Sequence, residues 1–237
     1  MAQKDTKHPA LNRKIIIFRF IFTVILMGVV LFLSAGTLQW WEGWVYMATS
    51  IVMLLGSRYL LIKKFPEVAA ERMDAGQKED TKPWDKVIVP LVAIYLPMAV
   101  WVTAGLEKRF GVNIGLPVWI QIIAFALVVA GSVFSNWAMF HNRFFSSHVR
   151  IQKDRGHTVV RDGPYGIVRH PGYAGGLIHF IATPLAFNAI WTWIPSLMLI
   201  GLYVVRIIKE EETLTAELPG YADYKNEVKY RMIPGVW

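Results

Sequence analysis

The sequence predicts an all-α, polytopic membrane protein with about six transmembrane helices and a cytoplasmic C-terminal helix. Of its 237 residues, 54% are hydrophobic, whereas a soluble domain usually has about 45–50% apolar residues. Only 18% are charged, and these charges lie in blocks between long apolar segments, which is typical of a polytopic membrane protein. The chain has no cysteine, which excludes disulfides, thiolate metal sites and cysteine nucleophiles.

The apolar segments are long enough for spanning helices, which need about 20 mostly apolar residues each. They cover 15–36, 43–62, 87–106, 117–140 and the long region 172–208, where two helices with a break near 188–195 are expected. Pro90 and Pro97 lie inside the third segment, where neighbouring helices can satisfy the freed carbonyl groups. The fifth span is short and contains Pro184. We therefore expect four transmembrane helices in 1–140 and a distinct C-terminal region in 141–237, which contains most of the polar residues that the spans do not explain.

The basic residues predict the orientation. Twenty of the 25 Lys and Arg residues lie in the N-terminal segment, the loops 63–86 and 141–171, and the tail 207–237; the other side has only Lys108 and Arg109. The positive-inside rule therefore places both termini and both long loops in the cytoplasm. The charges of 63–86 alternate in sign, which predicts a solvated connector with a short surface helix.

The N-terminal segment predicts a retained first helix. Its basic residues, Lys4, Lys7, Arg13 and Lys14, precede a long apolar run that has no small-residue cleavage site. A removed signal peptide would have such a site.

The sequence lacks the common motifs of metal-binding and nucleotide-binding sites. Five of the six histidines lie between His141 and His179, but their spacing does not place two imidazoles on one helical face, so no metal is expected. There is no GxGxxG after a strand and no P-loop. The basic residues flank apolar spans rather than forming a patch with aromatics, so no nucleic-acid partner is expected either.

The C-terminal region contains a series of motifs: the run HTVVRDGPYGIVRHPGY from His157 to Tyr173, Gly176, Glu210–Glu212, Gly220, Tyr221, Tyr224 and the closing Ile233-Pro234-Gly235. This series resembles the isoprenylcysteine carboxyl methyltransferase family, which is related to phospholipid methyltransferases. Arg-His-Pro-x-Tyr alone also occurs in membrane sterol reductases, but the full set in this order is specific. The resemblance covers about 150–237.

This resemblance implies an S-adenosylmethionine-dependent methyltransferase in the membrane, with a lipophilic acceptor that enters from the lipid bilayer. The acceptor would be an isoprenylcysteine carboxylate, a phospholipid amine or a thiol. The resemblance further assigns residues to the cofactor: Arg150, His157, Thr158, Val159, Val160, Tyr165, His170, Pro171, Gly172, Tyr173 and Glu211. Arg206 would face the acceptor and Arg169 would take part in catalysis. Which of Glu210, Glu211 and Glu212 faces the site stays open.

The residue types suit this cofactor, which has a carboxylate, an ammonium group, a sulfonium and an adenine ring. Arg150 and Arg169 can hold a carboxylate through their guanidinium forks. A glutamate can bind the ammonium or the ribose, and Tyr165 or Tyr173 can stack on adenine or face the sulfonium. Downstream, the spacing of Tyr221, Tyr224 and Val228 predicts a short helix that packs over the pocket.

Two other functions are compatible with the sequence. One is an NADPH-dependent membrane reductase of the sterol reductase type, although no pyrophosphate cradle is visible in 141–171. The other is a non-enzymatic membrane transporter or scaffold, although the two halves show no inverted repeat. Arg206 also has a purely structural alternative, an ion pair with Glu210 four residues later.

Overall fold

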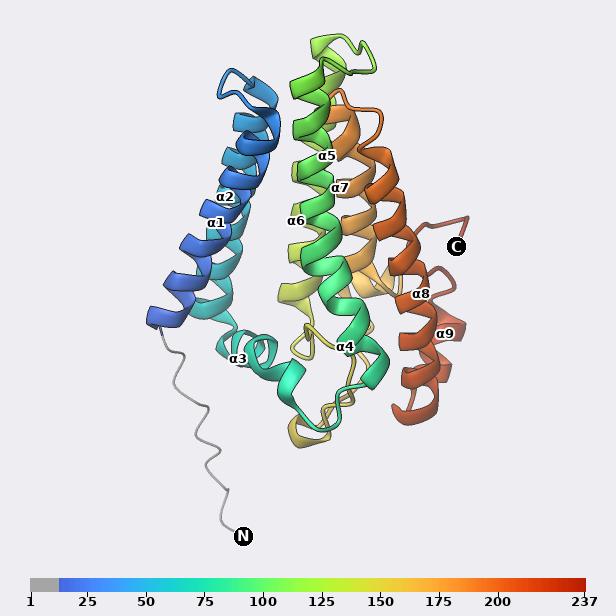
Figure 1. The fold of residues 1–237 in the computed structure, drawn as a ribbon. Helices are drawn as coiled ribbons and strands as arrows, with labels where there is room; N and C mark the ends of the chain where they lie inside the picture. The colour runs from blue at the N-terminus through green and yellow to red at the C-terminus, as the bar shows by residue number, and fades with distance from the viewer. Residues whose placement is uncertain (1–12) are drawn as a thin grey trace.

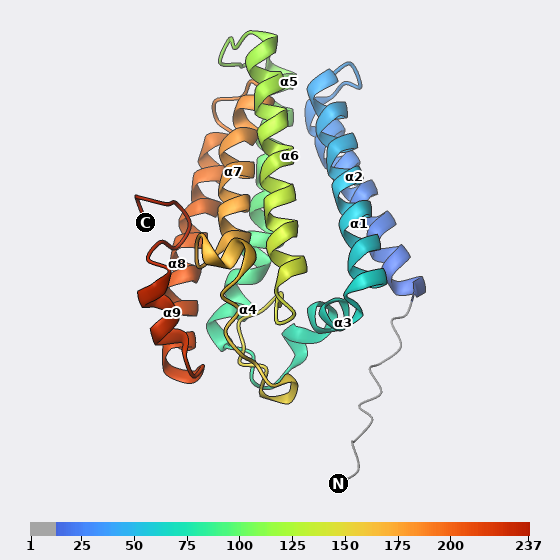
Figure 2. The same ribbon diagram turned by 180° about the vertical axis from the view of Figure 1, so that it is seen from behind.

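The computed structural model describes residues 13–237, and this part of the chain is helical without a β-strand. The long helices stand side by side. Short loops join them at one end, while the long loops and the small helices gather at the other (Figures 1 and 2). The predicted all-α class is confirmed. Lys4 and Lys7, on which part of the orientation prediction rests, lie outside the described residues.

Four helical segments are long and apolar enough to cross a membrane, in agreement with the first four predicted spans. They are α1 (Arg13–Ala35), α2 (Trp41–Lys64), the continuous segment α4 (Pro83–Pro90), η2 (Leu91–Tyr95) and α5 (Leu96–Phe110), and α6 (Val118–His141). Together they make this a polytopic membrane protein.

The fifth and sixth predicted spans correspond to α7 (Pro171–Ala186) and α8 (Trp193–Glu217), so the predicted break between them is confirmed. With 16 residues, α7 is shorter than a typical span. The 25-residue α8 ends in a charged segment. Neither belongs to the four candidate spans. The short helix predicted near Tyr221 is present as α9 (Tyr221–Glu227).

The third span is irregular next to its first proline. Pro90 lies within α4, and the five residues that follow it form the π-helical turn η2. Proline has no N–H for an i−4 hydrogen bond, and its ring crowds the carbonyl one turn earlier. A π-helical turn absorbs this misfit, and such turns are frequent at functional sites.

Helices α6 and α7 approach each other closely through two glycines. A Cβ on Gly175 would lie 2.4 Å from the carbonyl oxygen of Gly131, and a Cβ on Gly131 would lie 2.5 Å from that of Gly175. Ser135 donates a hydrogen bond of 2.8 Å to the Gly172 carbonyl one turn away. The first turn of α7 is thereby fixed against α6.

The connector 63–86 is only partly the solvated loop that its charges predict. It does contain the expected surface helix, α3 (Pro66–Asp74). However, Glu71 and Asp85 are buried, and Asp85 has no exposed surface at all. The prediction of a solvated connector is wrong at these two positions, because each carboxylate binds an arginine from a distant segment.

Candidate active site

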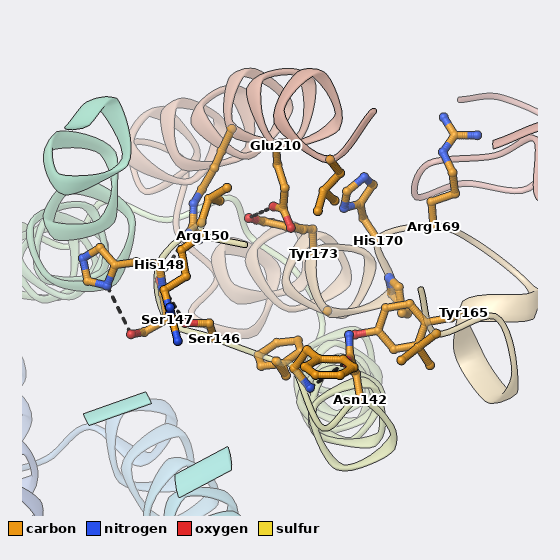
Figure 3. A pocket seen from close by; sticks show the side chains of 18 of the residues that line it. Asn142, Ser146, Ser147, His148, Arg150, Tyr165, Arg169, His170, Tyr173 and Glu210 are labelled. Atoms are coloured by element: carbon orange, nitrogen blue, oxygen red, sulfur yellow. Dashed lines mark hydrogen bonds between the residues drawn. The ribbon is translucent and has the colours of Figure 1, made fainter. Parts of the chain in front are cut away.

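A cavity of about 360 Å³ lies at the end of the molecule where the long loops gather. Its walls come from α3, α4, η2, the loop 142–170, α7, α8 and α9, so segments from most of the chain contribute (Figure 3). This volume falls within the range of small-molecule sites, about 300–1,000 Å³. The cavity is therefore large enough for a cofactor-sized ligand.

Twelve of the thirteen predicted site residues line this one cavity. They are Arg150, His157, Thr158, Val159, Val160, Tyr165, Arg169, His170, Pro171, Gly172, Tyr173 and Arg206. The exception is Glu211, because its neighbour Glu210 lines the cavity instead. Consecutive helical residues point about 100° apart, and at this point of α8 Glu210 faces the cavity while Glu211 points away from it.

Glu211 is buried behind the cavity wall, where three basic side chains share its carboxylate. Its Oε1 accepts hydrogen bonds from Arg169 Nε at 2.5 Å and His170 Nε2 at 3.3 Å, and its Oε2 accepts one from Arg231 Nε at 2.9 Å. Arg169 Nη1 also donates to the Val228 carbonyl at 2.7 Å. Glu211 thus ties the start of α7 to α8 and to the C-terminal tail.

Arg150 is clamped in a similar way. Its guanidinium donates to Glu71 through Nε (2.8 Å) and Nη2, to Asp80 through Nη1 (2.7 Å) and to Asp154 through Nη2 (3.0 Å). Burial alone would lower the pKa of Arg150, but the bonds to Glu71, Asp80 and Asp154 outweigh it and raise the pKa above its usual value. The arginine therefore fastens the loop 142–170 to α3.

Arg206 of α8 forms a bidentate ion pair with Asp85 of α4. Its Nε and Nη2 donate to the two Asp85 oxygens at 2.7 and 2.9 Å. Asp85 also accepts the Val149 N–H at 2.7 Å. The alternative partner, Glu210, instead accepts a hydrogen bond from the Tyr173 hydroxyl at 2.8 Å (Figure 3).

The cavity wall also contains polar groups that no described residue binds. The backbone of 158–160 makes no hydrogen bond within the described chain; Thr158 is exposed, and Val159 and Val160 are half-buried. The Tyr221 hydroxyl is buried, yet it has no partner there. Since buried polar groups are almost always hydrogen-bonded, the Tyr221 hydroxyl indicates where a ligand would bind, and the unbonded backbone of 158–160 lines the same cavity.

His157 adds a neutral imidazole to the same wall. Burial, followed by the positive charges of Arg150 and Arg155, lowers the pKa of His157 to about 4. Its Nδ1 accepts the Gln152 N–H at 3.3 Å, which leaves the ring proton on Nε2. At neutral pH the ring is therefore an uncharged hydrogen-bond donor.

One end of the cavity is apolar. It is lined by Val89, Val92 and Ala93 of the third span. Val89 and Val92 lie four and seven residues after Asp85, on the same helical face. This end therefore belongs to a helix that can cross the membrane.

Sequence reasoning missed several wall residues. Asn142, Phe145, Ser146, Ser147 and His148 line the cavity from the loop after α6. No periodic pattern marks such a loop, so its path is set by the contacts of its neighbours. Asp85, in contrast, had a visible signal, because it is an acidic residue at the border of an apolar segment.

Fold and cavity together define a polytopic helical membrane protein with a ligand-sized site at one end of its helices. Residues 122–216 match the model of the isoprenylcysteine carboxyl methyltransferase (ICMT) family. The predicted resemblance to that family is thereby confirmed. The match begins within α6, earlier than the predicted 150, and it ends before the motifs at 220–235.

Curated relatives agree with this match. A protein-S-isoprenylcysteine O-methyltransferase of Schizosaccharomyces pombe is 34% identical over 86 residues, 35% of this chain and 36% of the relative. A probable protein-S-isoprenylcysteine O-methyltransferase of Oryza sativa subsp. japonica is 30% identical over 95 residues, 39% of this chain and 50% of the relative. The chain thus spans half or less of the length of these relatives.

The similarity in fold extends further than the similarity in sequence. The solved structure of the eukaryotic intramembrane Ras methyltransferase ICMT aligns with 95% of this chain and 86% of its own, with a TM-score of 0.52 and 18% identity. The N-terminal helices, which lie outside the family match, therefore share the overall arrangement of that protein.

Proposed function

We propose that this protein is an integral membrane methyltransferase that transfers a methyl group from S-adenosylmethionine to a lipophilic acceptor. One observation carries the proposal. The same cavity is lined by polar groups without hydrogen-bond partners, from the loop 142–170 and α9, and by an apolar wall from a helix that can cross the membrane. A polar cofactor from the cytosol and an acceptor from the bilayer can therefore meet inside it.

The residues present fit S-adenosylmethionine. The unbonded backbone of 158–160 offers donors and acceptors to an adenine ring, and Tyr165 provides a flat aromatic surface beside it. The Glu210 carboxylate suits the ammonium group, and the unpartnered Tyr221 hydroxyl suits a ribose or carboxylate oxygen. When bound, the cofactor supplies a methyl group on a positively charged sulfonium, which is already activated for displacement.

Arg150, Arg169 and Glu211 then act as positioning residues. The guanidinium groups of Arg150 and Arg169 are already held by protein carboxylates, so they have little capacity left for the carboxylate of a cofactor. Glu211 is saturated by basic partners in the same way. Their contribution is to hold the loop 142–170 and the start of α7 where the wall needs them.

The protein's task in the transfer is alignment and exclusion of water. Holding two reactants in line lowers the barrier by avoiding entropy loss at the moment of reaction. Arg206 lines the cavity; Asp85 and the Ser147 carbonyl occupy its Nε and Nη2, whereas its Nη1 has no hydrogen-bond partner in the described chain and can orient the acceptor. A carboxylate acceptor, such as the isoprenylcysteine in the names of the relatives, needs no general base.

We further propose that α7 and α8 complete a set of six spans and that both termini and the loop 141–171 face the cytoplasm. The distribution of Lys and Arg supports this orientation. A single cysteine at Lys153, in a chain without other cysteines, should react with an impermeant maleimide only after the cells are opened. Labelling of intact cells would contradict the orientation.

The cofactor proposal is tested by binding to detergent-solubilised protein. S-adenosylhomocysteine should raise the melting temperature, because a ligand selective for the folded state stabilises it by mass action. A shift with NADPH and none with S-adenosylhomocysteine would support a reductase instead. Transfer of a labelled methyl group into a total lipid extract would then identify the acceptor class.

A further inference from the structure

Four arginines line the cavity, and one of them differs from the rest. Arg150, Arg169 and Arg206 are each paired with a carboxylate. Arg72, near the end of α3, forms no ion pair or side-chain hydrogen bond with any described residue. An arginine on a cavity wall without a counter-charge is a candidate for binding an anionic ligand.

We propose that Arg72 binds an anionic group, a carboxylate or a phosphate, of the methyl acceptor where α3 contributes to the cavity wall. The proposal rests on the proposed function, which it deepens by assigning a residue to the anionic group of the acceptor. Arg72 lies outside residues 122–216, which match the family model, so the family match does not assign this contact.

The position of Arg72 is well defined by its contacts. Its guanidinium carbon lies 5.2 Å from the centre of the Phe145 ring, which also lines the cavity. Its carbonyl accepts a hydrogen bond of 3.2 Å from the Ser147 hydroxyl. The face of the guanidinium is thus covered by an aromatic ring, while its N–H groups stay available for a ligand.

The electrostatic environment favours an anion. Burial, followed by the charges of Arg58 and Arg206, lowers the pKa of Arg72 to about 10. Arg72 therefore remains protonated at neutral pH while like charges oppose it. Independently, Arg58 Nε is buried without a hydrogen-bond partner in the described chain. An anion beside Arg72 would relieve this excess of positive charge.

Geometry connects Arg72 to the apolar end. Arg206, which is close enough to Arg72 to affect its pKa, is bonded to Asp85. Val89 and Val92 extend from Asp85 along the same face of the third span, and both line the cavity. An amphiphile with its anionic group at Arg72 would place its hydrocarbon chain against these residues.

The test uses the full chain in phosphatidylcholine nanodiscs, with binding measured by equilibrium dialysis and corrected with empty discs. The probes are dodecanoate, dodecyl phosphate and the neutral dodecanol, together with the soluble anions acetate and inorganic phosphate. Arg72→Gln should weaken both anionic amphiphiles on the order of 10- to 100-fold, since it removes hydrogen bonds to a charged group. Binding of dodecanol and of S-adenosylhomocysteine should be unchanged.

Two further variants complete the design. Lys64→Gln removes a charge from an exposed position at the end of α2, away from the cavity, and should leave all probes unaffected. Arg72→Lys keeps the charge but loses the guanidinium fork, and it should retain more affinity for the anionic amphiphiles than Arg72→Gln. If Arg72→Gln misfolds and no longer binds S-adenosylhomocysteine, Arg72→Lys takes its place in the test. Weaker binding of the anionic amphiphiles by Arg72→Lys than by the wild type supports the proposal, and equal binding contradicts it.

Each outcome separates this inference from the proposed function. Normal dodecanoate binding by a folded Arg72→Gln variant would overturn the role of Arg72 and leave the methyltransferase proposal standing. Arg72-dependent binding of dodecanoate without any binding of S-adenosylhomocysteine would overturn the proposed function. Acetate or phosphate binding as tightly as the amphiphiles would show that the anion comes from solution, which would overturn the acceptor assignment.

Discussion

The N-terminal hairpin of α1 and α2 differs in kind from the region formed by α6 to α9. The hairpin buries few side chains, among them Met27, Leu31 and Tyr46, and much of its remaining apolar surface is exposed. In the C-terminal region, loops and small helices close over the ends of the spanning helices (Figure 2), and buried carboxylates hold them there.

The difference indicates which region of the molecule depends on particular side chains. Apolar packing is non-directional, so the hairpin can exchange one apolar residue for another at little cost. A buried ion pair is directional, and removing one partner leaves an uncompensated charge. Substitutions should therefore be tolerated at the exposed positions of the hairpin and should be severe around the cavity.

The largest effect is expected at Glu211. Glu211→Ala leaves Arg169, His170 and Arg231 without their shared carboxylate. Loss of one partner of a buried pair costs about 3–5 kcal/mol, so thermal unfolding in detergent should occur at a much lower temperature. The matched control is Glu212→Ala, an exposed glutamate one residue later, which should change stability by less than about 0.5 kcal/mol. Equal effects would contradict the network.

The second prediction concerns Arg206 and Asp85. Arg206→Met alone should cost about 3 kcal/mol, because the fully buried Asp85 loses its counter-charge. Adding Asp85→Leu should recover part of the stability, because it removes the unpaired charge but leaves the Val149 N–H without its acceptor; denaturation of the single and double variants measures this. If Arg206 also orients the acceptor, the double variant binds S-adenosylhomocysteine but does not turn over. Restored turnover would limit Arg206 to a structural role.

The contact of α6 with α7 gives a smaller effect. In Gly175→Ala the new methyl group meets the backbone of Gly131 at 2.4 Å, and overpacking of this kind costs about 1–3 kcal/mol. Gly201→Ala in α8 is the control, since a Cβ there meets nothing within 4 Å. Comparable melting temperatures for the two variants would mean that α6 and α7 can move apart without loss of stability.

His157 gives a pH dependence of stability. Its pKa is about 4 in the folded protein and about 6.5 in an unfolded chain, so the unfolded state binds more protons between these values. The free energy of unfolding should therefore fall as the pH drops from 6.5 to 4. We expect on the order of 1 kcal/mol, because solvent screens part of the effect at this partly exposed ring.

The measurement is thermal unfolding across this pH range, with His157→Gln as the comparison. A glutamine side chain does not titrate, so the curve of the variant should be flatter than that of the wild type by this amount. Parallel curves for the two proteins would mean that His157 is protonated equally easily in both states.

The smallest effect is expected at the exposed face of the hairpin. Leu33 is 71% exposed, whereas Leu31 has no exposed surface. Leu33→Ala should change the stability by less than about 0.5 kcal/mol, and Leu31→Ala should cost about 2–5 kcal/mol. Comparison of their melting temperatures measures how much of α1 packs against other helices. A large effect at Leu33 would indicate a partner on that face.

Much of the helical architecture could be predicted because each span follows from its own residues. A run of about 20 apolar residues has to be helical in a bilayer, where every backbone group needs an internal partner. The predicted boundaries of α1, α2 and α6 therefore lie within a few residues of the observed ones. The π-helical turn after Pro90 was not predicted, since a proline can be accommodated by a kink as well as by a bulge.

The site was partly predictable for a different reason. The run from His157 to Tyr173 is contiguous, so its motif is visible in the sequence, and most of it lines the cavity. Arg72, Phe145 and Val92 carry no such signal, because they come from separate segments that only the fold brings together.

The sequence by itself determined the spans, the break between α7 and α8, and the segment that lines the cavity, since these depend on local composition and contiguous motifs. Tertiary structure alone decided which charges pair. Arg206 binds Asp85, 121 residues away, rather than Glu210 on the next turn, and Glu210 faces the cavity while Glu211 lies behind it. The physical reason is that a buried charge needs an opposite charge within about 4 Å, and only the packing of the helices sets which one lies there.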